Sequence, residues 1–189
     1  MSPLHYFYKN WEEFPWNIQI GPKALRWPGS QRDIPTYGAG VLSLQLCAEL
    51  WQELANIIRS DKVPNRDYLV VDVRDDDYAG GNIKNAVNIP SREFLTGVDS
   101  LVQKTADVKA VVFHCALSQM RGVLNANRGP KAARIYEETR NNSKLAQDKP
   151  QEIYVLSHGF TDFQRKYKDD PALVEKWDKE VWENAEDWS

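Results

Sequence analysis

Cys115 and two downstream arginines are the residues of this sequence whose types and spacing favour nucleophilic chemistry on an anion. Residues 114–130 read HCALSQMRGVLNANRGP, so Arg121 follows the cysteine by six positions and Arg128 by thirteen. A cysteine that leaves a buried strand shortly before a helix lies where backbone N–H groups and the helix dipole favour negative charge. Thiols in such places ionise more readily than that of free cysteine, and the thiolate is the nucleophile. The pattern therefore predicts that Cys115 attacks an electrophile and that an arginine binds an oxyanion beside it.

The loop after Cys115 is predicted to form a ring of backbone N–H groups around a tetrahedral oxyanion. Its members are Ala116, Leu117, Ser118, Gln119, Met120 and Arg121. The guanidinium of Arg121 would add a bidentate contact to two of the oxygens. His114 has two interpretations: its ring orients the loop and helps to hold the thiolate, or it is a half-buried histidine with satisfied hydrogen bonds. We expect Cys115 and Arg121 to be catalytic, with His114, Asp72 and Arg128 in supporting positions.

Four short apolar runs predict the strands that position these residues. They cover residues 68–73, 86–90, 109–113 and 153–156, and the third leads directly into His114 and Cys115. Apolar residues at three- and four-residue spacing after Ser43 predict an earlier helix, whose stripe includes Cys47 as a buried core thiol. A further helix is predicted over residues 130–140, with proline at its first position. The alternation predicts an α/β domain with a mainly parallel sheet flanked by helices, and ligands beyond the carboxyl ends of its strands.

The chain is predicted to have three parts. Residues 1–40 hold three tryptophans among prolines and glycines without sustained periodicity, which indicates an irregular aromatic arm. Residues 41–166 contain the predicted α/β domain. Residues 167–189 are predicted to form an acidic, amphipathic C-terminal helix that begins at Asp170 and Pro171 and packs on the domain. The arm has an alternative role as a partner-binding segment, and the acidic face of the tail has one as a docking site.

Composition excludes several classes of partner. The chain has a net charge of −3 and a pI of about 5.7. It therefore lacks the excess of basic residues that is typical of proteins that bind nucleic acid or anionic lipid. No apolar run approaches the roughly 18 residues of a membrane span, and the first residues lack the apolar stretch of a secretion signal. We therefore expect a cytoplasmic or nuclear protein with no membrane and no nucleic-acid partner. Two cysteines and three scattered histidines predict neither a disulfide framework nor a metal site.

Three blocks of the sequence match patterns of one enzyme family. They are HCALSQMRG with RGPKAAR further on, DVRDDDYAGGNIKNAVNIP at residues 72–90, and VLSHGFTDF at residues 155–163. Together they resemble the rhodanese-fold phosphatases related to the M-phase inducer (cell-division-cycle) phosphatases, and also the yeast-type arsenate reductases. The second block departs from the pattern at Asn82, where a histidine is usual. The resemblance covers about residues 41–166 and implies a rhodanese-like domain in which Cys115 attacks phosphorus or arsenic, while the loop amides and Arg121 bind the equatorial oxygens.

The proton donor of the resembling phosphatases has no equivalent inside this loop. The cell-cycle phosphatases carry glutamates there, whereas Ala116 follows the cysteine and Met120 precedes the arginine in this chain. The candidate carboxylates outside the loop are Asp75, Asp76, Asp77 and Glu93. Each of them is expected to be a solvated surface or loop carboxylate.

Residues 123–129 separate the loop from the helix, whereas in the resembling family the two follow each other directly. In one register, residues 115–121 close the ring, Arg121 binds the anion and the extra residues bulge out. In the other, Arg128 keeps the junction with the helix and reaches back to the anion. The first register is favoured, because a closed ring needs contiguous geometry whereas a bulge costs only modest loop entropy. Either register allows a longer distance from the thiolate to the helix N-terminus, which would weaken the activity.

The sequence predicts a cysteine-dependent phosphatase of the protein tyrosine phosphatase type that acts on phosphotyrosine-type or small aryl phosphates through a phosphocysteine intermediate. Its predicted ligand is a phosphate-type oxyanion, on a phosphoprotein or a small molecule, and no cofactor is expected. One alternative is an arsenate reductase with glutathione or glutaredoxin as reductant. Two others are a thiosulfate-type sulfurtransferase, whose loop is typically one residue shorter, and a catalytically weakened rhodanese-like binding module.

Overall fold

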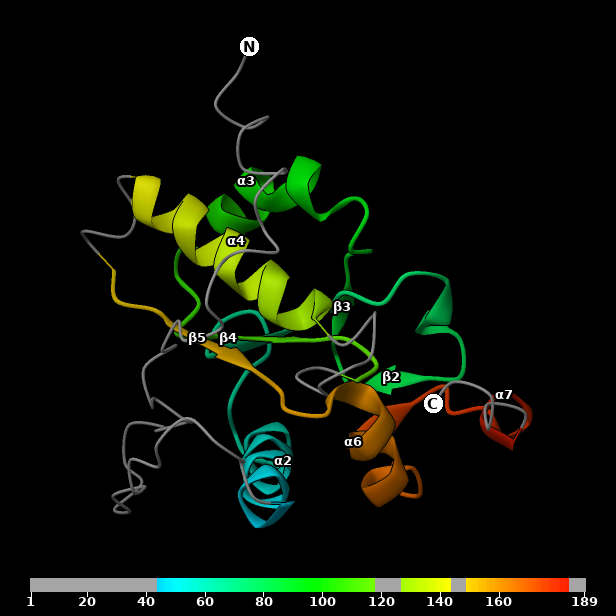
Figure 1. Cartoon of the computed structure of the whole chain (residues 1–189). Coiled ribbons are helices and arrows are strands. Elements are labelled where there is room, and N and C mark those ends of the chain that lie inside the picture. The colour runs from blue at the N-terminus through cyan, green and yellow to red at the C-terminus, as the bar shows by residue number, and fades with distance from the viewer. Residues whose placement is uncertain (1–43, 118–126, 144–148, 184–189) are drawn as a thin grey trace. The chain divides into compact units, whose positions relative to one another are not determined.

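The computed structural model describes residues 44–117, 127–143 and 149–183, with side chains from Trp51 onward. A four-stranded parallel sheet is its centre, in the order β3-β1-β4-β5 (Figure 1). The strands are β1 (Tyr68–Asp72), β3 (Val87–Asn88), β4 (Ala110–His114) and β5 (Glu152–Val155). Every residue of β1 and β4 is buried, as expected of central parallel strands covered on both faces. The register places Asp72 opposite His114 at the carboxyl ends of these two strands.

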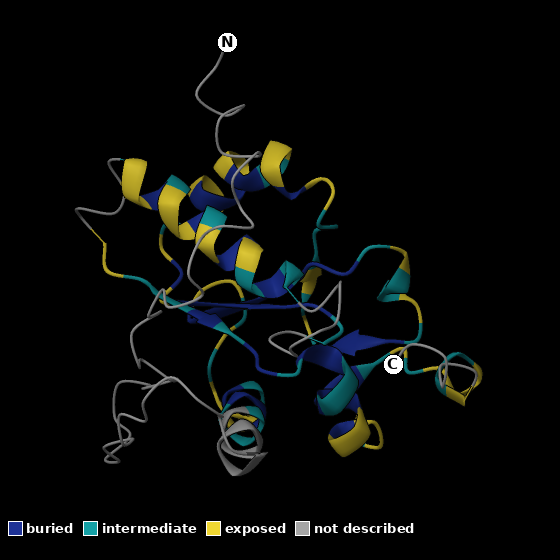
Figure 2. Ribbon diagram, in the orientation of Figure 1, coloured by how far each residue is buried: buried dark blue, intermediate teal, exposed yellow. Residues whose placement is uncertain are grey.

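Helices cover both faces of the sheet. They are α2 (Leu44–Arg59), α3 (Phe94–Lys104), α4 (Arg128–Asn142) and α6 (Gly159–Tyr167). Figure 1 shows α3 and α4 on one face and α2 and α6 on the other. The core between the sheet and the α3–α4 pair includes Phe94, Phe113 and Tyr136, all nearly inaccessible to solvent. Figure 2 shows this arrangement as buried strands beneath helices whose outer surfaces are exposed.

Smaller elements connect these layers at the carboxyl edge of the sheet. They are the 3₁₀ turn η2 (Asp76–Tyr78), β2 (Asn82–Ile83), β6 (Val174–Glu175) and α7 (Lys179–Glu183). Strand β6 pairs antiparallel with β2, which brings the C-terminal part of the chain next to the segment that follows η2. Trp182 of α7 donates its indole N–H to the carbonyl of Gly80 and packs on the ring of Phe160. The last described residues therefore contact the domain.

The predicted strands are confirmed, because all four apolar runs contain a strand of the parallel sheet. The helix predicted from residue 130 begins two residues earlier, at Arg128, so Pro130 is its third residue. A proline is tolerated there, because the first four N–H groups of a helix have no partner within the helix. The backbone N–H of Lys131 makes the first bond of this helix, to the carbonyl of Asn127.

The predicted C-terminal helix starting at Asp170 is wrong. Asp170 does begin a turn, in which its carbonyl accepts from the N–H groups of Leu173 and Val174. The turn does not continue, because Val174 enters β6 and Lys176 takes a left-handed conformation with φ of 57°. Only α7 is helical beyond this point in the described part of the tail. Pairing with β2 and burial of Leu173 in the core thus override the local helix signal.

Some predictions fall outside the described residues. They concern the aromatic arm of residues 1–40, the cap at Ser43, the side chain of Cys47 and most of the predicted loop after α4. Helix α3 was not predicted from the sequence, although its buried residues Phe94, Val98, Leu101 and Val102 follow a helical period. Across the described ranges, no helix is both long and apolar enough to cross a bilayer.

Candidate active site

Cys115 directly follows β4 and is fully buried. Its carbonyl accepts a hydrogen bond from the N–H of Phe160 (2.9 Å), and the carbonyl of Ala116 accepts one from Thr161 (3.0 Å). Both donors belong to the first turn of α6. Because the C=O and N–H of a trans peptide point in opposite directions, the N–H groups of Ala116 and Leu117 point away from α6. Helix α6 therefore fixes the orientation of the first two amides of the predicted ring.

A left-handed backbone makes this contact possible. His158 and Gly159 both have φ of 56°, at the entrance to α6. A Cβ atom on residue 159 would overlap the carbonyl oxygen of Cys115 and lie 2.5 Å from that of Ala116. Only glycine lets the start of α6 approach the cysteine loop this closely.

A buried ion pair lies at the carboxyl end of β1, next to the loop. Asp72 and Arg74 are both inaccessible to solvent, and their closest nitrogen–oxygen distance is 2.7 Å. The Arg74 guanidinium also donates to the carbonyl of Gly81 (2.7 Å) and to that of Asp77 (3.2 Å). Its central carbon lies 4.2 Å from the centre of the Phe160 ring, a favourable cation–π distance. The pair thus ties β1 to η2, to the start of β2 and to the α6 residue that binds Cys115.

His114 is fully buried between this ion pair and the cysteine. Its Nε2 lies 3.7 Å from Oδ2 of Asp72, and its Nδ1 lies 3.3 Å from the carbonyl oxygen of Cys115. Burial lowers the pKa of His114, although the negative charge of Asp72 opposes this shift. The ring is therefore neutral at neutral pH, and it contacts the backbone that leads into the loop.

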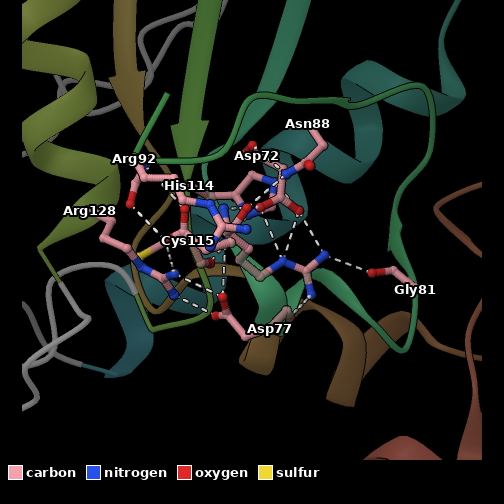
Figure 3. A network of polar contacts seen from close by, with 11 residues as sticks. Asp72, Asp77, Gly81, Asn88, Arg92, His114, Cys115 and Arg128 are labelled. Carbon is pink, nitrogen blue, oxygen red and sulfur yellow. Dashed lines mark hydrogen bonds and ion pairs between the residues drawn. The ribbon is translucent and has the colours of Figure 1, made fainter. Parts of the chain in front are cut away.

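Arg128 is the first residue of α4, and its side chain points toward η2. Its Nη1 donates to Oδ1 of Asp77 (2.8 Å) and to Oδ2 of Asp75 (2.9 Å), and its Nη2 donates to the other oxygen of Asp77. Burial lowers the pKa of Arg128, but these hydrogen bonds raise it above its usual value, with a contribution from Cys115. Figure 3 shows the sulfur of Cys115 beside the Arg128 side chain. The structure thus brings Arg128, His114, Asp72 and Cys115 to one edge of the sheet.

The predicted carboxylates outside the loop have structural partners or face solvent. Burial raises the pKa values of Asp75 and Asp77, but hydrogen bonds to Arg128, and to Ser91 in the case of Asp75, outweigh it and hold both pKa values below the usual range. Both groups are therefore ionised at neutral pH and have no proton to donate. Asp76 is exposed and pairs with Arg92, and Glu93 is exposed as well.

The predicted ring is described only in part. Ala116 and Leu117 lie within the described residues, whereas Ser118, Gln119, Met120 and Arg121 lie outside them. No group of three or more histidine, cysteine, aspartate or glutamate side chains that could hold a metal ion occurs in the part of the chain that the structure describes.

Two residues next to the site were not singled out from the sequence. Arg74 is signalled by its D-x-R spacing from Asp72, and Gly159 by the Gly-Phe pair that follows β5. Both hold backbone segments in place rather than providing a reacting atom. A search for nucleophiles and anion ligands alone therefore misses them.

Comparisons with known proteins agree with this geometry. Residues 50–166 match the model of the Rhodanese-like domain. The chain is 35% identical over 120 residues to the dual specificity phosphatase ibp1 of Schizosaccharomyces pombe, covering 56% of this chain and 81% of that protein. It is 32% identical over 92 residues to Arsenate reductase 2.1 of Oryza sativa subsp. japonica, covering 48% and 52%. The solved structure of Ygr203w, a yeast protein tyrosine phosphatase of the Rhodanese family, superposes with a TM-score of 0.55 at 25% identity, covering 70% of this chain and 93% of that one.

Proposed function

The chain belongs to the rhodanese-like domain family, and we propose that it is a cysteine-dependent phosphatase of the protein tyrosine phosphatase type. One observation carries the proposal: Cys115 stands at the carboxyl end of β4, with its loop held by α6 and the guanidinium of Arg128 nearby. The similarity to a dual specificity phosphatase supports the same reaction. A phosphorylated protein or a small aryl phosphate is the proposed substrate.

In the proposed reaction the Cys115 thiolate attacks phosphorus, so that an S–P bond forms and the P–O bond to the leaving group breaks. Water then hydrolyses the phosphocysteine, which releases phosphate and restores the thiol. The amides of residues 116–121 and an arginine would bind the equatorial oxygens and neutralise their charge. Because Asp75 and Asp77 are ionised, neither can protonate the leaving group. A phenolate leaves more easily than an alkoxide without such help, so we favour aryl phosphates as substrates.

Changing Cys115 to serine tests the proposal. The serine hydroxyl is not ionised at neutral pH, so hydrolysis of p-nitrophenyl phosphate is expected to fall to the uncatalysed background. The measurement is kcat/KM for the native chain and the variant, with circular dichroism to confirm that both are folded. Undiminished hydrolysis by Cys115→Ser would show that another group is the nucleophile. If the native chain turns over no oxyanion at all, the binding-module alternative gains support.

Arsenate reduction is the second candidate, and the similarity to a rice arsenate reductase favours it. The same thiolate would attack arsenic, and two electrons from glutathione would convert arsenate to arsenite. Arsenate-dependent oxidation of NADPH in an assay coupled through glutathione and glutaredoxin measures this activity. If the chain is a phosphatase, aryl phosphate hydrolysis is expected to be faster than arsenate reduction. Arsenate-dependent oxidation without such hydrolysis would reverse the order.

A comparison of two arginine variants tests which register the loop adopts. We propose Arg121 as the anion clamp, so Arg121→Ala is expected to lower kcat/KM for p-nitrophenyl phosphate on the order of a hundredfold. In the alternative register, Arg128 at the start of α4 has that role. A near-native Arg121→Ala together with a strongly impaired Arg128→Ala would assign the clamp to Arg128.

A further inference from the structure

Two carboxylates occupy the terminal nitrogens of Arg128. Asp77 binds Nη1 and Nη2 with its two oxygens, and Asp75 adds a bond to Nη1. The side chains of Arg128, Asp75 and Asp77 are only 13%, 21% and 15% exposed, so water screens the ion pairs weakly. The two-pronged contact with Asp77 is the one by which arginine binds two oxygens of a phosphate group. Asp77 therefore fills the position on Arg128 that an oxyanion would take.

Other bonds hold these two carboxylates in place. Asp75 accepts from the hydroxyl of Ser91 (2.7 Å) and from the backbone N–H of Arg92 (3.3 Å). Asp77 accepts from the backbone N–H of Asp75 (3.0 Å), and its own carbonyl is bound by Arg74. The carboxylates thus stay fixed on η2 and its neighbours if Arg128 turns away. We therefore expect the arginine side chain to be the partner that moves.

We propose that Asp75 and Asp77 form a latch on Arg128, which a phosphate-type oxyanion arriving at Cys115 must displace. The two carboxylates carry two negative charges, similar to the roughly −1.5 to −2 of a phosphate monoester at neutral pH. While they hold the arginine, its charge is neutralised and Cys115 faces a region of net negative charge. When the guanidinium turns to the oxyanion, it neutralises part of the oxyanion's charge and gives up its bonds to Asp75 and Asp77. The latch rests on the proposed function for the class of ligand and for its place beside Cys115. It makes Arg128 a second contact of the oxyanion, in addition to the proposed clamp Arg121.

A latch of this kind lowers affinity, because only the fraction of molecules with a released arginine is competent to bind. Asp77→Asn keeps the shape and the backbone bond of the side chain but removes its charge. Isothermal titration of inorganic phosphate is expected to show binding on the order of tenfold tighter to Asp77→Asn than to the native chain. The matched control is Asp76→Asn, which removes the same charge at the neighbouring position. Asp76 is exposed and pairs with Arg92. The phosphate affinity of this variant is expected to stay within about twofold of native.

The double variant Arg128→Ala/Asp77→Asn separates the latch from a general effect of charge. If the latch exists, Asp77→Asn has no further effect once Arg128 is absent, because the two changes are coupled. Tightening that persists without Arg128 would overturn the latch, and so would native or weaker affinity of Asp77→Asn. Absence of phosphate binding by every form would overturn it as well. Urea unfolding checks that Asp77→Asn is folded, and Asp75→Asn is the second variant, with a smaller gain expected.

The phosphatase activity and the latch are tested by different measurements. Its readout is hydrolysis by the native chain and loss of hydrolysis in Cys115→Ser, whereas the latch is read from equilibrium affinities. In one outcome, hydrolysis depends on Cys115 while Asp77→Asn binds phosphate no more tightly than the native chain. That pair of results would contradict the latch and leave the phosphatase proposal intact. The expected affinity order without hydrolysis would contradict the phosphatase alone.

Discussion

Replacing Arg74 with methionine is expected to lower the free energy of unfolding by about 3–5 kcal/mol. The substitution keeps most of the side-chain volume but leaves the carboxylate of Asp72 buried without its cationic partner. It also leaves the carbonyls of Gly81 and Asp77 without their guanidinium donor. A typical domain has only about 5–15 kcal/mol of stability in total, so the loss is a large fraction of it. Urea unfolding followed by tryptophan fluorescence measures the change.

The matched control is the same substitution at Arg134. This arginine pairs with Glu138 one helical turn away, and both side chains are about half exposed. Arg134→Met is expected to cost no more than about 0.5 kcal/mol, because exposed pairs of this kind contribute little. Adding Asp72→Asn to the Arg74→Met variant should recover part of the loss, since it removes the uncompensated charge. Equal stability of Arg74→Met and Arg134→Met would contradict a structural role for the buried pair.

The strands and the place of Cys115 could be predicted because both depend on local sequence. A short continuous apolar run is typical of a buried parallel strand, and the run at 109–113 ends directly before His114 and Cys115. The carboxyl end of such a strand is where ligands bind in parallel sheets. The location of the site at this edge of the sheet could therefore be predicted without knowledge of the rest of the fold.

The contacts of Arg128 and the end of the chain could not be predicted in this way. Arg128 pairs with carboxylates 51 and 53 positions earlier, and periodicity carries no information about such distant partners. The sequence at Asp170 has the local pattern of a helix start, but pairing of β6 with β2 decides its structure. Both failures have the same cause, because tertiary contacts override what a short segment favours alone.

A second large effect is expected where α6 contacts the cysteine loop. Gly159→Ala is expected to lower the free energy of unfolding by at least about 3 kcal/mol, of which about 1–2 kcal/mol comes from the left-handed backbone. The rest comes from the overlap of the new methyl group with the carbonyl oxygens of Cys115 and Ala116. These are backbone atoms, so relief of the overlap must move the loop or the start of α6.

Such a movement would also displace the nucleophile. A misplacement of about 1 Å can cost on the order of a hundredfold in rate, so kcat/KM for p-nitrophenyl phosphate is expected to fall by about that factor in the folded fraction of Gly159→Ala. The matched control is Gly97→Ala, where a Cβ meets no atom within 4 Å and the glycine lies inside helix α3. Alanine favours helix over glycine, so Gly97→Ala is expected to gain about 0.5–1 kcal/mol and keep its activity. If both alanine variants unfold at the same urea concentration and hydrolyse substrate equally, the close approach of α6 does not fix the cysteine loop.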